Sequence, residues 1–126
     1  MENNFKRYDL EERLIDFAVQ ILDVCELLPQ TFAAKHLGGQ LVRSGTSPAL
    51  NYGEAQAAES KADFLHKMKI CLKELRESQI CLKIIFKKKY IIENKLQFIL
   101  KECGELVAIF TKSIVTASIK NENHKT

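Results

Sequence analysis

Apolar residues recur at helical spacing along most of the chain, and this pattern predicts its elements. Toward the N-terminus they stand alternately four and three positions apart, at Leu10, Leu14, Phe17, Ile21, Val24 and Leu28. Such spacing places them on one face of a helix, which we expect over residues 8–28. Acidic residues in its first turn suit the positive end of the helix dipole, and Pro29 cannot continue the helix.

The second helix is expected over residues 31–59 and contains the most polar run of the chain, Arg43–Pro48. Apolar residues on both sides of this run still share one helical face, so a single helix bent near Pro48 explains the pattern better than a loop. We expect nearby hydroxyl groups to bond the carbonyls that the bend frees. Gly38 and Gly39 weaken the helix and suggest that another helix passes close to them.

Two further helices are expected over residues 61–89 and 92–119. Ser60 and Asp63 resemble a capping pair at the start of the first of these. Its apolar seam alternates steps of four and three, at Phe64, Met68, Cys71, Leu75, Ser78, Leu82 and Ile85. The last helix has a wide apolar face, which could contact two neighbours or leave a stripe for a second subunit.

Short turns between these helices predict an all-α fold, an up-down-up-down antiparallel four-helix bundle. The chain has 126 residues, 46% of them hydrophobic, and this length suits a single domain spanning residues 1–126. Only 5 Gly and 2 Pro are present, and so few turn signals also favour long helices over many short strands.

The charge balance is mildly basic, with 19 Lys and Arg against 16 Asp and Glu and a formal net charge of +3. A dedicated duplex-DNA-binding protein carries a stronger bias, so charge alone does not identify a partner. The N-terminus has no apolar core of signal-peptide type, and polar residues interrupt every apolar cluster before it reaches the length of a membrane span. We therefore expect a cytoplasmic protein without a membrane partner.

Side chains that could support catalysis or bind a metal ion are scattered. The four cysteines form no CxxC pair and lie within helical patterns, which predicts reduced, mostly buried thiols at Cys25, Cys71, Cys81 and Cys103. The 3 histidines stand singly, so we expect no metal site and no cofactor. Since no spacing supplies a general base or nucleophile pair, we also expect no enzymatic activity.

Arg43, Ser44, Asn51 and Glu54 form a polar group that ordinary bundle construction does not require. Asn51 and Glu54 are three positions apart and share a helical face, whereas Arg43 lies across the bend and could reach a carboxylate or a phosphate. One interpretation is a functional cluster. The other is that these side chains satisfy the opened backbone and one another.

The third helix is distinctly basic, which makes it a candidate nucleic-acid-binding face. Four of its cations fall on one stripe that phosphates could follow, Lys69, Lys73, Arg76 and Lys83. Arg43 completes this candidate set. The alternative is a solvated outer face on which Lys73 pairs with Glu77, four positions later.

The segment QLVRSGTSPALNYGEAQAA, followed by DFLHKMKICLKELRESQICLKII, resembles the bacterial 23S rRNA intervening-sequence proteins, which are often described as ribosomal proteins. The resemblance rests on the Gln-Leu-x-Arg-Ser run, the Ser-Pro step, Asn51 with Glu54-Ala55, and the stretch Asp63–Glu74. It implies a four-helix bundle that assembles into rings, typically pentamers, and it implies no catalytic residues.

Some members of that family are encoded inside insertions in the large-subunit rRNA gene. The related accessory variability protein of diversity-generating retroelements is a basic pentamer that binds a reverse transcriptase and nucleic acid. The resemblance therefore implies a non-enzymatic homopentamer that binds structured RNA through a basic surface, with RNA, the ribosome or a reverse-transcriptase-like protein as candidate partners. The alternative is a protein-interaction scaffold or accessory subunit without direct RNA contact.

Overall fold

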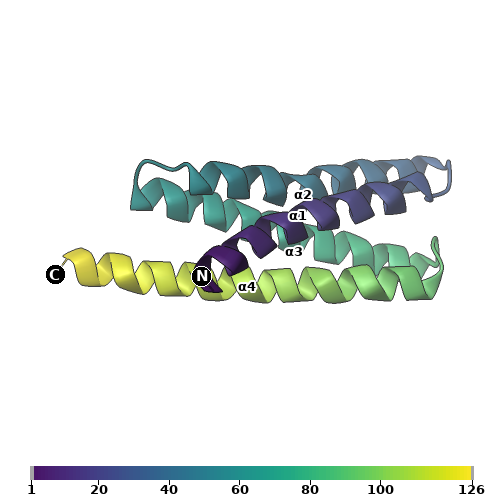
Figure 1. Cartoon of the computed structure of the whole chain (residues 1–126). Coiled ribbons are helices and arrows are strands. Elements are labelled where there is room, and N and C mark those ends of the chain that lie inside the picture. Colours follow the sequence, from purple (N-terminus) through teal and green to yellow (C-terminus); the bar gives the residue numbers. More distant parts are fainter. Residues whose placement is uncertain (1, 126) are drawn as a thin grey trace.

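Four helices account for nearly the whole chain in the computed structural model, which describes the backbone of residues 2–125 and the side chains of residues 10–92 and 94–119. Their bounds are α1 Glu2–Glu26, α2 Phe32–Gln56, α3 Lys61–Lys88 and α4 Glu93–Lys125. Consecutive helices run in opposite directions and lie side by side (Figure 1). The predicted all-α four-helix bundle is confirmed.

The ends of the bundle differ from the expected bounds at three places. Helix α1 begins at Glu2 rather than near residue 8, and α2 ends at Gln56 rather than near residue 59. Helix α4 continues to Lys125 rather than ending near residue 119, and its C-terminal end runs past the α2–α3 turn (Figure 1). Backbone hydrogen bonds within a helix are local, so its last turns can form without a neighbouring helix to cover them.

Capping side chains place the helix boundaries. The Thr31 hydroxyl accepts a hydrogen bond from the Ala34 amide at 3.2 Å, and the Ser60 hydroxyl accepts one from the Asp63 amide at 3.0 Å. The predicted Ser60 cap is therefore confirmed. Helix α3 ends at Lys89, whose left-handed backbone (φ 58°) lets its amide bond the carbonyls of the last turn.

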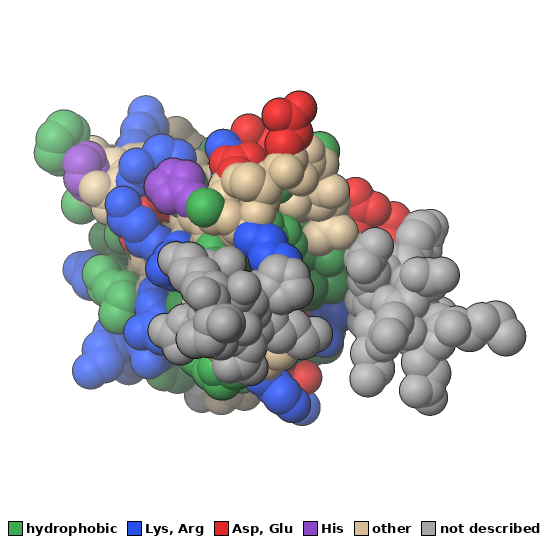
Figure 2. Space-filling view, turned by 90° about the vertical axis from the view of Figure 1, so that its left-hand side faces the viewer, with side chains coloured by type: hydrophobic (Ala, Val, Ile, Leu, Met, Phe, Trp, Pro, Cys, Tyr) green, Lys and Arg blue, Asp and Glu red, His purple; other side chains and the backbone are tan. Residues whose placement is uncertain are grey.

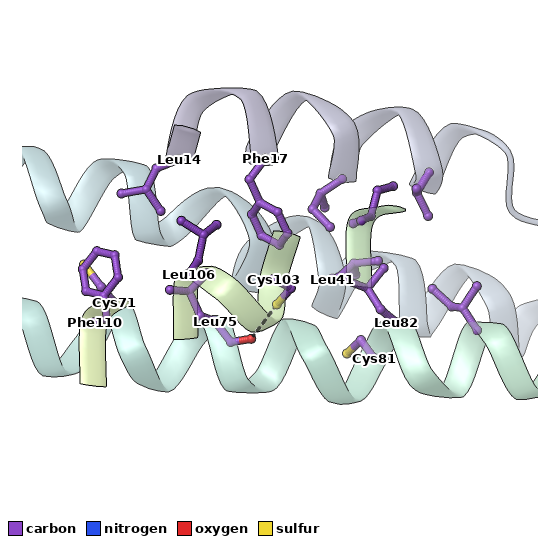
Figure 3. Packing of buried hydrophobic residues seen from close by; sticks show 14 of the residues in the cluster. Leu14, Phe17, Leu41, Cys71, Leu75, Cys81, Leu82, Cys103, Leu106 and Phe110 are labelled. Atoms are coloured by element: carbon purple, nitrogen blue, oxygen red, sulfur yellow. Dashed lines mark hydrogen bonds between the residues drawn. The ribbon is translucent and has the colours of Figure 1, made fainter. Parts of the chain in front are cut away.

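The core consists of the predicted apolar seams, which face inward on each helix. Leu14 and Phe17 point from α1 into the bundle, and Leu106 and Phe110 of α4 are fully buried (Figure 3). The Phe110 ring also makes an edge-to-face contact with Tyr52 of α2, with 5.9 Å between ring centroids. These contacts join three of the helices around one interior.

Helices α1 and α2 approach closely at Gly45. A Cβ atom there would lie 2.6 Å from Cγ2 of Ile21, a fully buried residue of α1, so only glycine permits this contact. Gly38 faces Leu28, which lies in the turn after α1, whereas the space beside Gly39 is open, so the expectation of a close helix at Gly39 was wrong. Close packing thus depends on Gly38 and on Gly45, which the apolar pattern did not single out.

Helix α1 contacts α4 much less than it contacts α2. An ion pair joins this looser edge: Nε and Nη2 of Arg13 donate to the two carboxylate oxygens of Glu102 at 3.0 and 2.7 Å. Both side chains are largely shielded from solvent, and a two-pronged guanidinium–carboxylate contact fixes their orientation. The pair therefore orients α1 against α4 where apolar contact is sparse.

Helix α2 continues through Pro48 without a break. Thr46 donates its hydroxyl to the Val42 carbonyl at 2.7 Å, and Ser44 donates to the Leu41 carbonyl at 3.5 Å. Proline at position 48 has no amide hydrogen to donate, so it leaves the carbonyl of Ser44 without its helical partner. The two hydroxyls bond other carbonyls, so the expectation that they bond the freed one was wrong. The bend itself stays a prediction.

Replacing Gly45 with alanine should destabilise the bundle by about 1–2 kcal/mol, because the new methyl group forces Ile21 and α1 outward and this outweighs the better helix propensity of alanine. Gly39→Ala, six positions earlier on α2, is the matched control. It meets open space and should stabilise by about 0.5–1 kcal/mol. Urea unfolding followed by circular dichroism measures both, and equal effects of the two variants would contradict the close contact at Gly45.

Candidate nucleic-acid interface

The four predicted residues of the polar group do not converge on one point. Each instead has its own partner: Arg43 with Glu77 (3.5 Å), Ser44 with Ser78 (2.9 Å), Asn51 with the Ser47 carbonyl (3.0 Å), and Glu54 with Lys67 (3.2 Å). Three of these partners lie on α3, so most of the group joins α2 to α3. The interpretation in which these side chains satisfy bonds within the bundle is the one that the geometry favours.

The most buried member of the group is Ser44. Its hydroxyl and that of Ser78 are both fully buried, and Ser78 donates to Ser44 across the α2–α3 contact. Two small polar side chains that bond each other allow these helices to approach closely without leaving an unpaired hydroxyl. Ser78 is therefore a packing residue of the predicted seam and not a ligand-binding group.

A partly buried carboxylate, which was not predicted from the sequence, lies beside this contact. Oε2 of Glu74 is buried and has no hydrogen-bond partner among the described residues. Burial, and then the neighbouring carboxylate of Glu77, raise the pKa of Glu74, while the positive charge of Arg43 opposes them. The signal that could have revealed it is the pair of acids three positions apart in an otherwise basic helix.

The predicted basic stripe is on the surface, along the outward face of α3. Lys69, Lys73, Arg76 and Lys83 are all exposed, and none of the four takes part in the ion pairs found among the described residues. Viewed along the bundle, Lys and Arg gather on the left-hand side, where α3 lies (Figure 2). This face can therefore approach phosphates without first breaking a salt bridge.

Two expectations about this face change. Arg43 lies on α2 and forms an ion pair with Glu77, so it is not part of the stripe on α3. Glu77 thus has Arg43 as its ion-pair partner, rather than the expected Lys73. Exposed Ile80 and Ile84 also interrupt the cations, and the sequence analysis did not single them out.

A cavity of about 790 Å³ lies between the C-terminal half of α1 and the start of α4. Its walls are mainly apolar, with Leu27, Ile92 and Phe98 exposed at its rim, and Asp23 and Lys95 as its charged groups. One carboxylate and one ammonium group do not make a nucleophile with a base to activate it. The cavity is thus better suited to apolar contact than to chemistry.

The cysteines are free, as expected, with Cys25 half-buried and the other three buried. Burial raises the pKa of Cys25 to about 11 and those of Cys71 and Cys103 to about 12, so these thiols stay protonated at neutral pH. Each donates its S–H to a carbonyl of another helix, for example Cys103 to Leu75 at 3.3 Å (Figure 3). They contribute to packing as unreactive, neutral groups.

Neither a metal centre nor a membrane span is found within the described part of the chain. No group of three or more His, Cys, Asp or Glu side chains among the described residues could hold a metal ion. Every helix there is too short or too polar to cross a lipid bilayer.

Comparison with known proteins gives a family match and a similar crystal structure. The sequence model of the 23S rRNA-intervening sequence protein family matches residues 6–112. A crystal structure from Bacteroides thetaiotaomicron, described as a protein of unknown function from the S23 ribosomal protein family, superimposes with a TM-score of 0.77. It is 30% identical in sequence, and the match covers 83% of this chain and 97% of the other. No curated protein matches the chain at a significant level.

Replacing Glu74 with glutamine should stabilise the bundle at pH 7. A carboxyl whose pKa is raised in the folded state stabilises the fold at pH values below its unfolded pKa. This stabilisation is lost as pH rises through the folded pKa, so the ionised form of Glu74 is the one that destabilises the bundle. The advantage of glutamine should therefore disappear at pH 4. Urea midpoints at the two pH values measure it, and Glu11→Gln, at an exposed carboxylate on α1, is the control. An advantage of glutamine that does not change with pH would contradict the raised pKa.

Proposed function

Because this chain belongs to the 23S rRNA-intervening sequence protein family, we propose that it is a non-enzymatic, self-associating helical bundle that binds structured RNA. Ribosomal RNA or a ribonucleoprotein is the leading partner. The contact is made to phosphates by the outward face of α3, with little base specificity. The family and the similar crystal structure are described as ribosomal-type or of unknown function, and neither description names an enzyme.

The observation that supports this function is the row of exposed cations on α3. Lys69, Lys73, Arg76 and Lys83 project from one face of a single straight element, so their spacing is set by the helix and not by a mobile loop. Flexible ammonium groups bind phosphate as point charges, without reading base edges. Aromatic side chains for stacking on single-stranded bases are not part of this row, which favours a folded RNA over a single strand.

Self-association strengthens the argument, because one chain carries a formal charge of only +3. A closed ring, a pentamer if it follows the geometry of the family, repeats the row around one axis and sums the potentials of its copies. A large RNA can then contact several copies at once, and this raises the overall affinity without any new type of contact.

The second candidate is a protein-interaction scaffold or accessory subunit, for instance of a reverse-transcriptase-like protein. Phe32 and Leu50, 91% and 69% exposed on α2, favour it, because large apolar side chains at the surface often mark protein contacts. A pull-down with and without ribonuclease separates the candidates. Partners that survive ribonuclease support the scaffold, and partners lost with the RNA support the RNA-binding function.

Affinity for a structured ribosomal RNA fragment should fall steeply between roughly 50 and 200 mM salt, with a log-log slope of about −0.7 to −0.9 for each phosphate neutralised. Lys69→Glu together with Lys83→Glu should weaken binding at least about tenfold at the lower salt, because each reversal replaces an attraction with a repulsion. Filter binding measures both effects.

The matched control is Lys35→Glu together with Lys101→Glu, which changes the net charge equally at exposed positions on α2 and α4. This control should retain most of the affinity. Equal losses of affinity in the two double variants would show that binding depends only on net charge. An affinity that does not change with salt would show that the protein does not contact phosphates. Either result would leave the scaffold as the better description.

A further inference from the structure

An acidic row with an apolar centre runs along the outward face of α1. Its members are separated by steps of three, four, three and four positions: Glu12, Ile15, Val19, Leu22 and Glu26. All five are exposed, and the three apolar members are 40–51% exposed although they lie on a well-formed helix. The core of the bundle uses the opposite side of α1, and each member of this row is exposed among the described residues.

The outward face of α3 carries a row of the same form and opposite sign. Its members are Lys73, Arg76, Ile80, Ile84 and Lys87, at steps of three, four, four and three. All are exposed, with Ile80 at 57% and Ile84 at 44%. Here too an apolar centre is flanked by charges at both ends. Figure 2 shows green side chains between the blue ones on this side of the bundle.

The two rows match in length and direction. Glu12 and Glu26 are 14 positions apart, as are Lys73 and Lys87, which is about 21 Å along a helix. Helices α1 and α3 run in the same direction, and both end at the end of the bundle that holds the α1–α2 and α3–α4 turns (Figure 1). The rows are therefore at similar heights on the bundle.

We propose that the row on α1 of one copy packs in parallel on the row on α3 of the next copy. Glu12 then faces Lys73 and Glu26 faces Lys87, while Val19 lies against Ile80 at the centre. Burial of the apolar residues supplies affinity, and the flanking charges set register and direction. A contact between two different faces repeats from copy to copy, so it builds a ring where the rotation closes.

A second copy fits these rows better than an unrelated partner, because the complement of each row is present in the same chain. Opposite charges at equal spacing with apolar residues between them are not required by the bundle's own core. The inference rests on the self-association in the proposed function, but not on RNA binding. In the assembled ring this contact occupies Lys73 and Arg76, so phosphate binding is left to Lys69, one turn before the row, and Lys83, beside it.

Two single substitutions test the interface from its two sides. Val19→Glu places a negative charge at the centre of the α1 row, and Ile80→Glu does the same on α3, so the two altered rows repel each other. Both positions are more than half exposed in the single chain, so both variants should keep the helical circular dichroism of the wild type. Each should sediment as a monomer of 14.4 kDa under conditions in which the wild type assembles. Ala108→Glu, at an exposed position on α4, is the control and should assemble normally.

Mixing the two variants gives the sharper result. The first keeps an intact α3 row and the second an intact α1 row, so an equimolar mixture should form a dimer of one copy of each and stop there. Native mass spectrometry detects it. Variants that stay assembled, or monomeric variants that form no mixed dimer, would overturn the inference while leaving wild-type self-association in place. A wild type that is itself monomeric would overturn both.

Discussion

The contact of three helices at Ser44 and Gly45 is the constraint on which the rest of the bundle depends. Gly45 lets the buried side chain of Ile21 lie against the backbone of α2, and the preceding residue bonds Ser78 of α3. Two consecutive residues of α2 thus set its separation from both neighbours. A larger side chain at either position would push a whole helix outward, because close-packed interiors do not absorb extra atoms locally.

This close packing explains why most of the polar group of α2 has partners on α3. Once α2 and α3 lie close together, Arg43 reaches Glu77 and Glu54 reaches Lys67, so the charges of the group are used at the α2–α3 edge. The same geometry leaves the Glu74 carboxylate partly buried beside Glu77, at a cost to stability. Protonated cysteines meanwhile fill the interior without introducing charge.

Function in such a molecule depends on its outer faces, which differ from one helix to the next. Helix α3 presents cations and α1 presents acids on their outward faces. A bundle with a different sign of charge on each of these faces has an electrostatic direction, which suits both an ordered assembly of copies and a polyanionic partner. The interior then serves mainly to hold these faces at fixed positions.

The sequence by itself determined the number of helices, their seams and most of their ends, since these follow from residues within a few turns of one another. The spacing of Leu14, Phe17 and Ile21 places them on one face wherever the helix lies, and Ser60 caps a helix within three residues. Tertiary structure alone decided which residues meet across helices. Ser44 and Ser78 are 34 positions apart, as are Arg43 and Glu77, and their pairing depends on the rotation and register of two packed helices. The periodic pattern specifies which side of each helix faces inward, but the position of one helix along another is set by how their side chains fit together.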